Sequence, residues 1–230
     1  MKNSKTCPNC TTQNPEYALQ CSQCSFVLNT RVPVIDFWSA FSGVIESPSE
    51  TFISIIRAEH KNYILFILPF VAFKLSLLAS LFIIHYYGVL LPFSSVLTGL
   101  LAFPVLFLLV CFVLTQIAKI TSLKPRNRDI IAVLSYAMTP IAISAVLLSI
   151  LEIAVFGISL FELSPSPFFL KPLFAWFFVL LEIAMVIWAM VMAGKALNHY
   201  FPRTVAYLLS LLVIGIVAGI AVIINPYLFS

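Results

Sequence analysis

The 230-residue sequence has few charged side chains. Only 10% of its residues are Asp, Glu, Lys or Arg, whereas soluble domains carry about 25%. Hydrophobic residues make up 61%, and the mean hydropathy is +1.06. This composition excludes a water-soluble globular domain. The few charges are also unevenly placed, because residues 1–61 carry ten and the much longer stretch 62–230 carries twelve. We therefore expect a polar N-terminal part followed by a membrane-embedded body.

The sequence also lacks the motifs of common catalytic sites. It has no Gly-x-Ser-x-Gly and no His-Glu-x-x-His, and its seven glycines form no phosphate-binding loop. In residues 1–61, five basic side chains balance five acidic ones, so the polar part has no basic arm for nucleic acid. We therefore expect a non-enzymatic protein without a nucleic-acid partner.

The strongest chemical signal lies within the first 24 residues. Two Cys-x-x-Cys pairs, separated by ten residues, are typical of a metal site in a short polar segment. The four predicted ligands are Cys7, Cys10, Cys21 and Cys24. Two such turns close a tetrahedral four-thiolate site without an open position, which predicts one structural Zn²⁺ ion. Iron in a rubredoxin-like site is the alternative, and a redox dithiol is a weaker one because a single pair would suffice for it.

Residues 7–25 resemble the short zinc-ribbon module that is common at the N-termini of prokaryotic proteins. The likeness includes the turn at Asn14-Pro15 between the two knuckles. The module usually has glycine after its second and fourth cysteines, where this chain has Thr11 and Ser25, so we expect a less relaxed backbone there. The resemblance implies a zinc ribbon over residues 1–30. This head is too small to bury a stabilising core, and metal binding is expected to supply its folding energy.

Five long apolar segments are expected within residues 62–230. The 44 residues from 75 to 118 carry no charge and as one helix would extend about 66 Å, so they must fold back across a ~30 Å membrane core. Tyr86–Pro92 is the natural turn. The predicted spans cover residues of about 62–86, 90–117, 130–156, 169–193 and 204–224. The expected fold is an all-α polytopic membrane protein with five transmembrane helices.

Basic side chains gather on one side of these spans. With the N-terminus in the cytosol, eleven of the thirteen Lys and Arg residues are cytosolic, only Lys171 is outside, and Lys74 lies within a span. Lys and Arg are retained on the cytoplasmic face of membrane proteins. We therefore expect a cytosolic N-terminus, which also fits the absence of a secretory signal from Met1–Asn29. An odd number of spans places the C-terminus outside.

Residues 31–61 are expected to form short amphipathic helices ahead of the first span. Apolar residues recur at helical spacing over 37–45 and 52–56. Ser47, Pro48 and Glu50 predict the start of the second helix, with a capping box between Ser47 and Glu50. Such helices either lie in the cytoplasmic membrane interface or pack against the cytosolic ends of the spans, and periodicity does not separate the two.

Three ionisable side chains lie within the expected spans, where each costs about 2.5–3.5 kcal/mol at the bilayer centre. Lys74 and Glu182 are about 18 and 20 Å deep from opposite ends, which predicts a pair near the midplane. Glu152 is about 33 Å from the inner end, so we expect it to meet water at the outer interface, and it is the next partner for Lys74 if Glu182 points elsewhere. We favour a structural pair. The alternative is a small transporter or channel that uses this polar site.

Prolines are expected to bend the spans. Pro69, Pro104 and Pro140 each remove a backbone hydrogen bond, and a neighbouring group must satisfy the freed carbonyl. At Pro140, the hydroxyl of Thr139 is suited to this task. We expect a static kink at Pro140 that shapes the bundle.

The membrane part resembles a known family. Residues 47–52 (Ser-Pro-Ser-Glu-Thr-Phe) precede the spans and residues 135–141 (Ser-Tyr-Ala-Met-Thr-Pro-Ile) lie in the third. Both are similar to segments of the Yip family of Ypt/Rab-interacting membrane proteins, over roughly residues 37–225. The resemblance implies a cytosolic N-terminal region, five spans and a membrane-organising role. With a zinc ribbon in front, we expect the prokaryotic branch, the bacterial cytoplasmic membrane, and a scaffold whose head binds a cytosolic protein partner.

Overall fold

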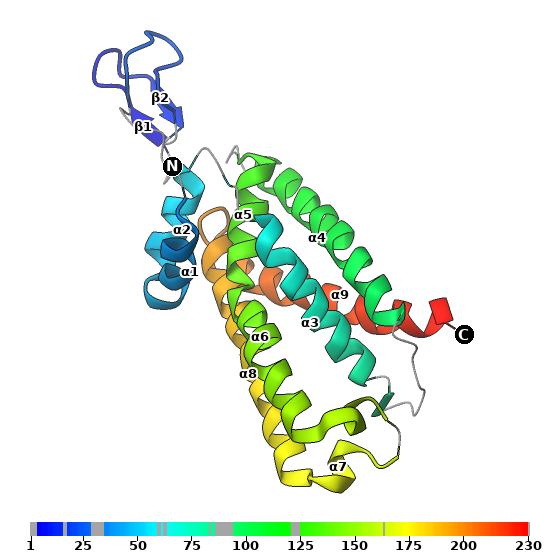
Figure 1. The fold of residues 1–230 in the computed structure, drawn as a ribbon. Helices are drawn as coiled ribbons and strands as arrows, with labels where there is room; N and C mark the ends of the chain where they lie inside the picture. The colour runs from blue at the N-terminus through cyan, green and yellow to red at the C-terminus, as the bar shows by residue number, and fades with distance from the viewer. Residues whose placement is uncertain are drawn as a thin grey trace.

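The computed structural model places a small β-hairpin head at one end of a helical bundle (Figure 1). It describes residues 4–15, 18–28, 35–58, 61, 64–82, 84–85, 94–120, 125–162 and 164–229. In the head, β1 (Ser4–Thr6) pairs antiparallel with β2 (Gln13–Pro15), and Lys5 lies opposite Asn14. Two short helices follow, α1 (Phe37–Glu46) and α2 (Pro48–Arg57).

The bundle consists of long apolar helices at the predicted spans and of short helices that connect them. They are α3 (Ile64–Phe82), α4 (Ser94–Ile120), α5 (Asn127–Ala137), α6 (Thr139–Phe156), the 3₁₀ helix η2 (Gly157–Phe161), α7 (Pro167–Leu170), α8 (Pro172–Leu197) and α9 (Arg203–Phe229). Within the described residues, three stretches are long and apolar enough to cross a membrane: Gly99–Ile120, Asn127–Phe161 and Pro172–Leu197. Two shorter apolar helices cover Phe66–Phe82 and Arg203–Ile216. The turn predicted at Tyr86–Pro92 lies outside the described residues.

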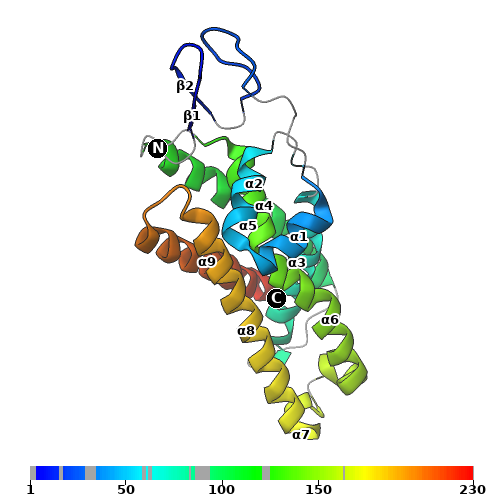
Figure 2. The ribbon, with the colours of Figure 1, turned by 90° about the vertical axis from the view of Figure 1, so that its left-hand side faces the viewer.

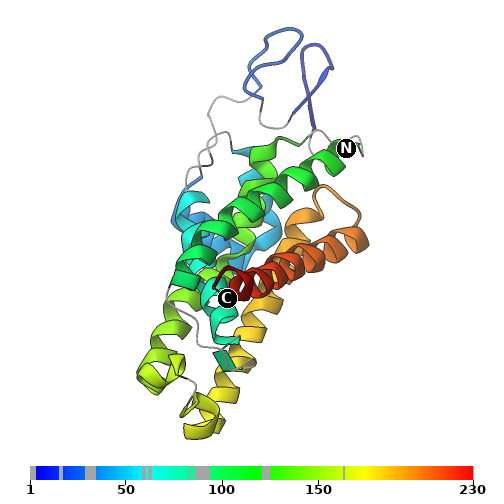
Figure 3. The ribbon, with the colours of Figure 1, turned by 90° about the vertical axis from the view of Figure 1, so that its right-hand side faces the viewer.

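The helices pack around one extended apolar core. α3 lies against α4, α6 and α9, and α8 lies against α5, α6 and α9. Figures 2 and 3 show α9 running obliquely across the long axis of the bundle, with the C-terminus at about mid-height. The core includes the fully buried side chains of Phe52, Phe107 and Leu134, so α2, α4 and α5 share it.

Two close contacts between the long helices depend on glycine. A Cβ atom at Gly99 of α4 would clash with the side chain of Ser76 in α3, and one at Gly194 of α8 would clash with the ring of Tyr207 in α9. Small residues let membrane helices approach closely, which increases dispersion contact where lipid and protein are equally apolar. The α3–α4 and α8–α9 pairs are packed in this way.

Large apolar side chains also cover the outside of the bundle. Leu101 on α4, Leu147 on α6 and Leu180 on α8 are all more than half exposed. Soluble proteins rarely expose contiguous apolar surface of this kind, because its contact with water is unfavourable. The outer surface of the bundle therefore suits a lipid environment.

The two short helices α1 and α2 pack on the bundle. Phe52 and Ile55 of α2 are fully buried in the main core, and α2 contacts α5 and α8. This arrangement matches the second of the two expectations, packing against the ends of the spans. Trp38 of α1 is nevertheless 72% exposed, as expected of an aromatic anchor at a membrane interface.

The capping box predicted at Ser47 is wrong. The Ser47 side chain makes no capping hydrogen bond, because Ser47 is also the last residue of the α1 turn and its N–H donates to the carbonyl of Gly43. That contact holds Ser47 at φ −138° and ψ 67°. The side chain of Thr51 instead donates to the Ser47 carbonyl at 3.0 Å.

The helix of the third expected span is interrupted just before Pro140. α5 ends at Ala137, Met138 has φ −80° and ψ 5°, and α6 begins at Thr139. Pro140 has no N–H to donate to the carbonyl of Tyr136 four residues earlier. The hydroxyl of Thr139 donates to this carbonyl at 2.6 Å, so the freed acceptor is satisfied locally.

Candidate metal centre and buried charge clusters

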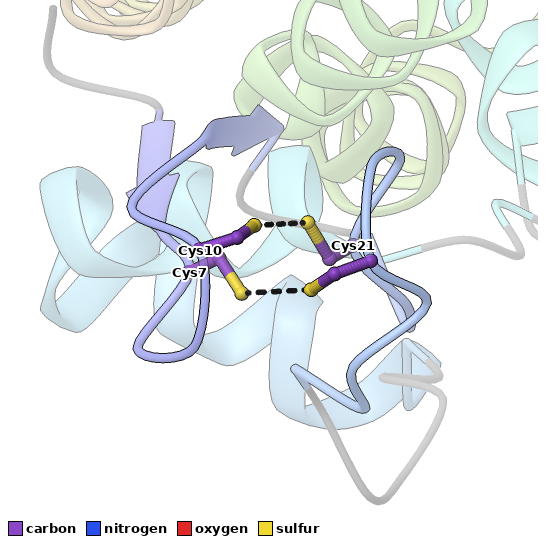
Figure 4. A group of neighbouring side chains, drawn as sticks. Cys7, Cys10 and Cys21 are labelled. Carbon is purple, nitrogen blue, oxygen red and sulfur yellow. Dashed lines mark hydrogen bonds between the residues drawn. The ribbon is translucent and has the colours of Figure 1, made fainter.

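Two tight turns bring the four head cysteines together. Cys7 and Cys10 follow β1, and the sulfur atoms of all four cysteines lie within 4.8 Å of one another. Cys7 Sγ is 3.6 Å from Cys24 Sγ, and Cys10 Sγ is 3.4 Å from Cys21 Sγ (Figure 4). Four sulfurs bound at about 2.3 Å around a tetrahedral ion are about 3.8 Å apart, close to these separations. The cysteines predicted as ligands therefore form a cluster that could bind a metal ion.

The two turns have the same backbone geometry. In the first, the N–H of Thr11 donates to the carbonyl of Cys7 at 2.9 Å, and in the second, the N–H of Ser25 donates to Cys21 at 3.0 Å. Thr11 and Ser25 have φ of 57° and 55°. This left-handed region favours glycine, so the strain expected where the zinc-ribbon module has glycine lies at these two residues.

Asn14 joins the two turns, a role that sequence reasoning did not assign to it. Its side chain is buried, and Nδ2 donates to the carbonyl of Thr12 at 2.9 Å and to Cys21 Sγ at 3.3 Å. Its Oδ1 accepts hydrogen bonds from the N–H and the hydroxyl of Ser22 at 2.8 and 3.0 Å. Asn14 therefore orients a ligand from outside the coordination sphere, as groups around metal sites commonly do.

The second turn stabilises a thiolate. Hydrogen bonds from the backbone N–H groups of Cys24 and Gln23 lower the pKa of Cys21 to about 6. Burial and the nearby Cys10 and Cys7 side chains raise the pKa of Cys24, in the same turn, to about 11. Thiolate is the form that binds metal, and four cysteine sulfurs are a donor set that suits a soft cation.

Lys74 forms the centre of a buried charge cluster. Its Nζ atom lies 2.6 Å from Glu182 Oε1 and 3.1 Å from Glu152 Oε2. The predicted pair thus lies together, and α3, α6 and α8 each supply one charge. Nζ also donates to Ser149 Oγ at 3.0 Å, while Ser144 Oγ donates to Glu182 Oε2 at 2.8 Å.

The expectation that Glu152 meets water at the outer interface is wrong. Glu152 is only 5% exposed and accepts a hydrogen bond from Lys74. Glu152 turns toward Lys74 of α3 inside the bundle, and α6 packs against both α3 and α8, so the side chain is covered by protein. Two carboxylates and one ammonium therefore share the site.

A second buried cluster lies at the end of the bundle near the head. Lys61 Nζ is 2.9 Å from Asp129 Oδ1, and both side chains are 3% exposed. Arg126 Nη2 contacts the same oxygen at 3.1 Å. Lys61 also donates to the carbonyls of Ile55 and Ile56 at the end of α2. Burial lowers the pKa of Lys61, and the Asp129 carboxylate opposes this shift only in part.

The long apolar helices, the apolar outer surface and the four-cysteine head define a membrane protein with a candidate metal-binding head. Residues 42–223 match the Yip1 domain family. Because this match covers most of the chain, the protein belongs to the Yip1 domain family, as the resemblance of the two short segments indicated. A search of curated proteins found no match, and a search of solved structures found none either.

Proposed function

We propose that the protein is a non-enzymatic membrane scaffold of the bacterial cytoplasmic membrane, whose zinc-bound head recruits a cytosolic protein. Five spans anchor it: α3, α4, the joined α5 and α6, α8 and α9. The N-terminus is cytosolic and the C-terminus is outside. The Yip1 family membership, the four-cysteine cluster and the exposed apolar bundle surface support this proposal.

The observation that carries the proposal is a pair of exposed apolar side chains on the head. Phe26 and Val27, next to the second turn, are 43% and 52% exposed. All four cysteines are committed to one cluster, so a metal ion there would have no open position for catalysis. A rigid knuckle with a closed metal site and an apolar tip is suited to present a contact surface to another protein.

The distribution of basic residues supports the orientation. Arg57 and Lys119 lie at the C-terminal ends of α2 and α4, Arg203 begins α9, and Lys171 lies between α7 and α8. In Figure 1, α2 and the end of α4 next to α5 lie toward the head, and α7 lies at the opposite end of the bundle. With the head in the cytosol, the positive charges are on the side where membrane insertion retains them. Reporter fusions at the two ends should give a cytosolic signal only at the N-terminus. A cytosolic signal at the C-terminus would overturn the five-span topology.

Site-specific photo-crosslinking tests the recruiting role. A photoreactive residue at Val27 in the full-length protein should yield one discrete cross-linked partner in cells. The same residue at Pro8, exposed on the first turn, is the matched control and should not yield that product. Phe26→Ser should reduce the Val27 product at least fivefold. Equal products at both positions, or none at Val27, would contradict the proposal.

The same preparation distinguishes a scaffold from the alternative, a small transporter or channel. Purified protein in sealed proteoliposomes should leave proton and potassium flux at the level of empty liposomes. Flux that rises with protein and falls in Glu182→Gln would favour the alternative over the scaffold.

A further inference from the structure

An apolar cavity of about 630 Å³ lies at the end of the bundle far from the head. Residues of α3, α6, η2, α7 and α8 line it. In Figure 1, α7 and the adjoining ends of α6 and α8 lie at the bottom of the bundle. Aromatic rings form much of its wall: Phe82, Phe156, Phe168, Trp176 and Phe178. Its size is that of pockets that enclose small organic ligands.

Among the described residues that line this cavity, two are acidic. Glu152 and Glu182 both line the cavity, whereas Lys74 does not. Lys74 is fully buried behind them, so the 5% and 7% of the two glutamates that remain exposed belong to the cavity side. Glu182 Oε1 lies 2.6 Å from Lys74 Nζ. A carboxylate oxygen has two lone pairs, so Oε1 can accept a second hydrogen bond from the cavity side.

The charges in this cluster do not balance. One ammonium faces two carboxylates in a low-dielectric site where an uncompensated charge is costly, so the second carboxylate needs either a proton or a second cation. A cation on the cavity side would meet this need. The aromatic rings of the cavity also favour a cation, because their quadrupoles attract cations within about 6 Å of the ring face.

We propose that this cavity binds an organic ammonium ion with an apolar body. The charged nitrogen pairs with Glu152 and Glu182, and the apolar body lies among the aromatic rings. The site goes beyond the scaffold role and does not depend on it, since it lies at the opposite end of the bundle from the head.

Dansylcadaverine is a suitable probe, because it carries a primary ammonium on an apolar fluorophore. Full-length protein in nanodiscs of zwitterionic lipid should bind it saturably, measured by dansyl anisotropy against empty nanodiscs. The N-acetylated probe has the same body without the charge and should bind at least tenfold more weakly. Equal binding of both probes would show an apolar pocket without charge recognition and would overturn the proposal, as would the absence of saturable binding.

Substitutions then locate the site. Glu152→Gln and Glu182→Gln should each weaken binding at least tenfold, whereas Glu162→Gln, at an exposed carboxylate outside the cavity, should leave it unchanged. Lys74→Met should tighten binding, because the probe then supplies the missing cation. Unchanged affinity in both glutamate variants would overturn the proposal.

A steric pair keeps the test decisive if the charge variants fail to fold. Val179 lines the cavity and its neighbour Leu180 faces outward, with 64% of its surface exposed. Val179→Trp should abolish saturable probe binding by filling the cavity, and Leu180→Trp should not. Equal binding by these two variants would place the probe elsewhere and contradict the proposal.

Discussion

The head and the bundle hold their folds by different means. In the head, the buried apolar residues among those described are Cys7, Cys21 and Leu28, and the first two are candidate metal ligands. In the bundle, large side chains such as Phe107 and Leu134 are fully buried in one continuous core. The four-cysteine cluster thus stands where the bundle has large apolar side chains, which predicts that a metal ion bound there stabilises a chain segment too short to supply apolar burial.

The two regions also use buried polar groups differently. In the head, Asn14 joins two turns through neutral hydrogen bonds around the sulfur cluster. In the bundle, Lys74 joins three helices through full charges. A single ammonium lies between two carboxylates there, and Ser149 and Ser144 supply further hydrogen bonds to the cluster.

Removal of one cysteine should have the largest effect. Cys21→Ser should lose the bound ion and unfold the head, because a four-thiolate zinc site contributes on the order of 10 kcal/mol. Metal analysis of the purified protein should give one zinc per chain for the parent. The variant should hold less than about 0.1 zinc per chain, because loss of one thiolate removes most of the binding energy. Cys111→Ala, at the buried cysteine of α4, is the control and should keep the zinc. Iron in place of zinc would correct the identity of the metal, and no metal with four reduced thiols would contradict the site.

The buried charges of the bundle should give the next largest effect. Lys74→Met leaves two carboxylates without their cation and should lower stability by about 3–5 kcal/mol. The triple variant Lys74→Met, Glu152→Gln, Glu182→Gln should recover part of this loss, because no uncompensated charge remains. Thermal unfolding in detergent measures both, with Lys119→Met at an exposed position as the control. A Lys74→Met protein as stable as the control variant would refute the structural role of the cluster.

The cluster near the head should contribute less to stability. Its single carboxylate, Asp129, pairs with Lys61 and with Arg126, which lies at the edge of the cluster. Asp129→Asn should destabilise the bundle by about 1.5–3 kcal/mol, the range for hydrogen bonds to charged groups, and Arg128→Gln should be neutral. Burial already lowers the pKa of Lys61, and loss of Asp129 should lower it further. The unfolded state then binds more protons than the folded state, so the deficit should shrink as pH rises through the folded pKa of Lys61. A deficit that grows with pH would contradict this assignment.

Backbone strain in the head should give the smallest effect. Thr11→Gly and Ser25→Gly should each stabilise the metal-bound head by roughly 0.5 kcal/mol, because the relief of a left-handed φ exceeds the added entropy of the unfolded chain. The gain should be greater at Thr11, which is β-branched. Resistance of zinc to a chelator is the measurement. Thr6→Gly, within β1, is the control and should lower the resistance of zinc to the chelator. A lower resistance in Thr11→Gly as well would contradict the claim that Thr11 is strained.

Local spacing predicted the head well. Each Cys-x-x-Cys turn is a short-range feature, so the cluster of four cysteines could be predicted from the sequence, and the four sulfurs lie together. The capping box at Ser47 failed although it is also local, because the preceding helix ends at the same residue. A local pattern is therefore reliable only where no neighbouring element uses the same backbone groups.

Contacts between distant helices were only partly predictable. The number of residues from each membrane face predicted that Lys74 and Glu182, on two antiparallel helices, lie at the same depth. Lys74 Nζ and Glu182 Oε1 are 2.6 Å apart. The burial of Glu152 could not be read in this way, because it depends on how α6 packs against α3 and α8 and turns the side chain toward Lys74. Lys61 and Asp129 are 68 residues apart in sequence and no periodic pattern links them, so their contact required the three-dimensional structure.

Stepwise cysteine alkylation of the full-length protein tests the central claim, that metal binding holds the head and packing holds the bundle. Four cysteines report on the head and Cys111, which is fully buried, reports on the bundle. Intact-mass measurement should give no alkylation of the metal-bound protein in mild detergent, four modifications after zinc is chelated, and the fifth only after a denaturant unfolds the bundle. A fifth modification upon chelation alone, or four without chelation, would contradict the account.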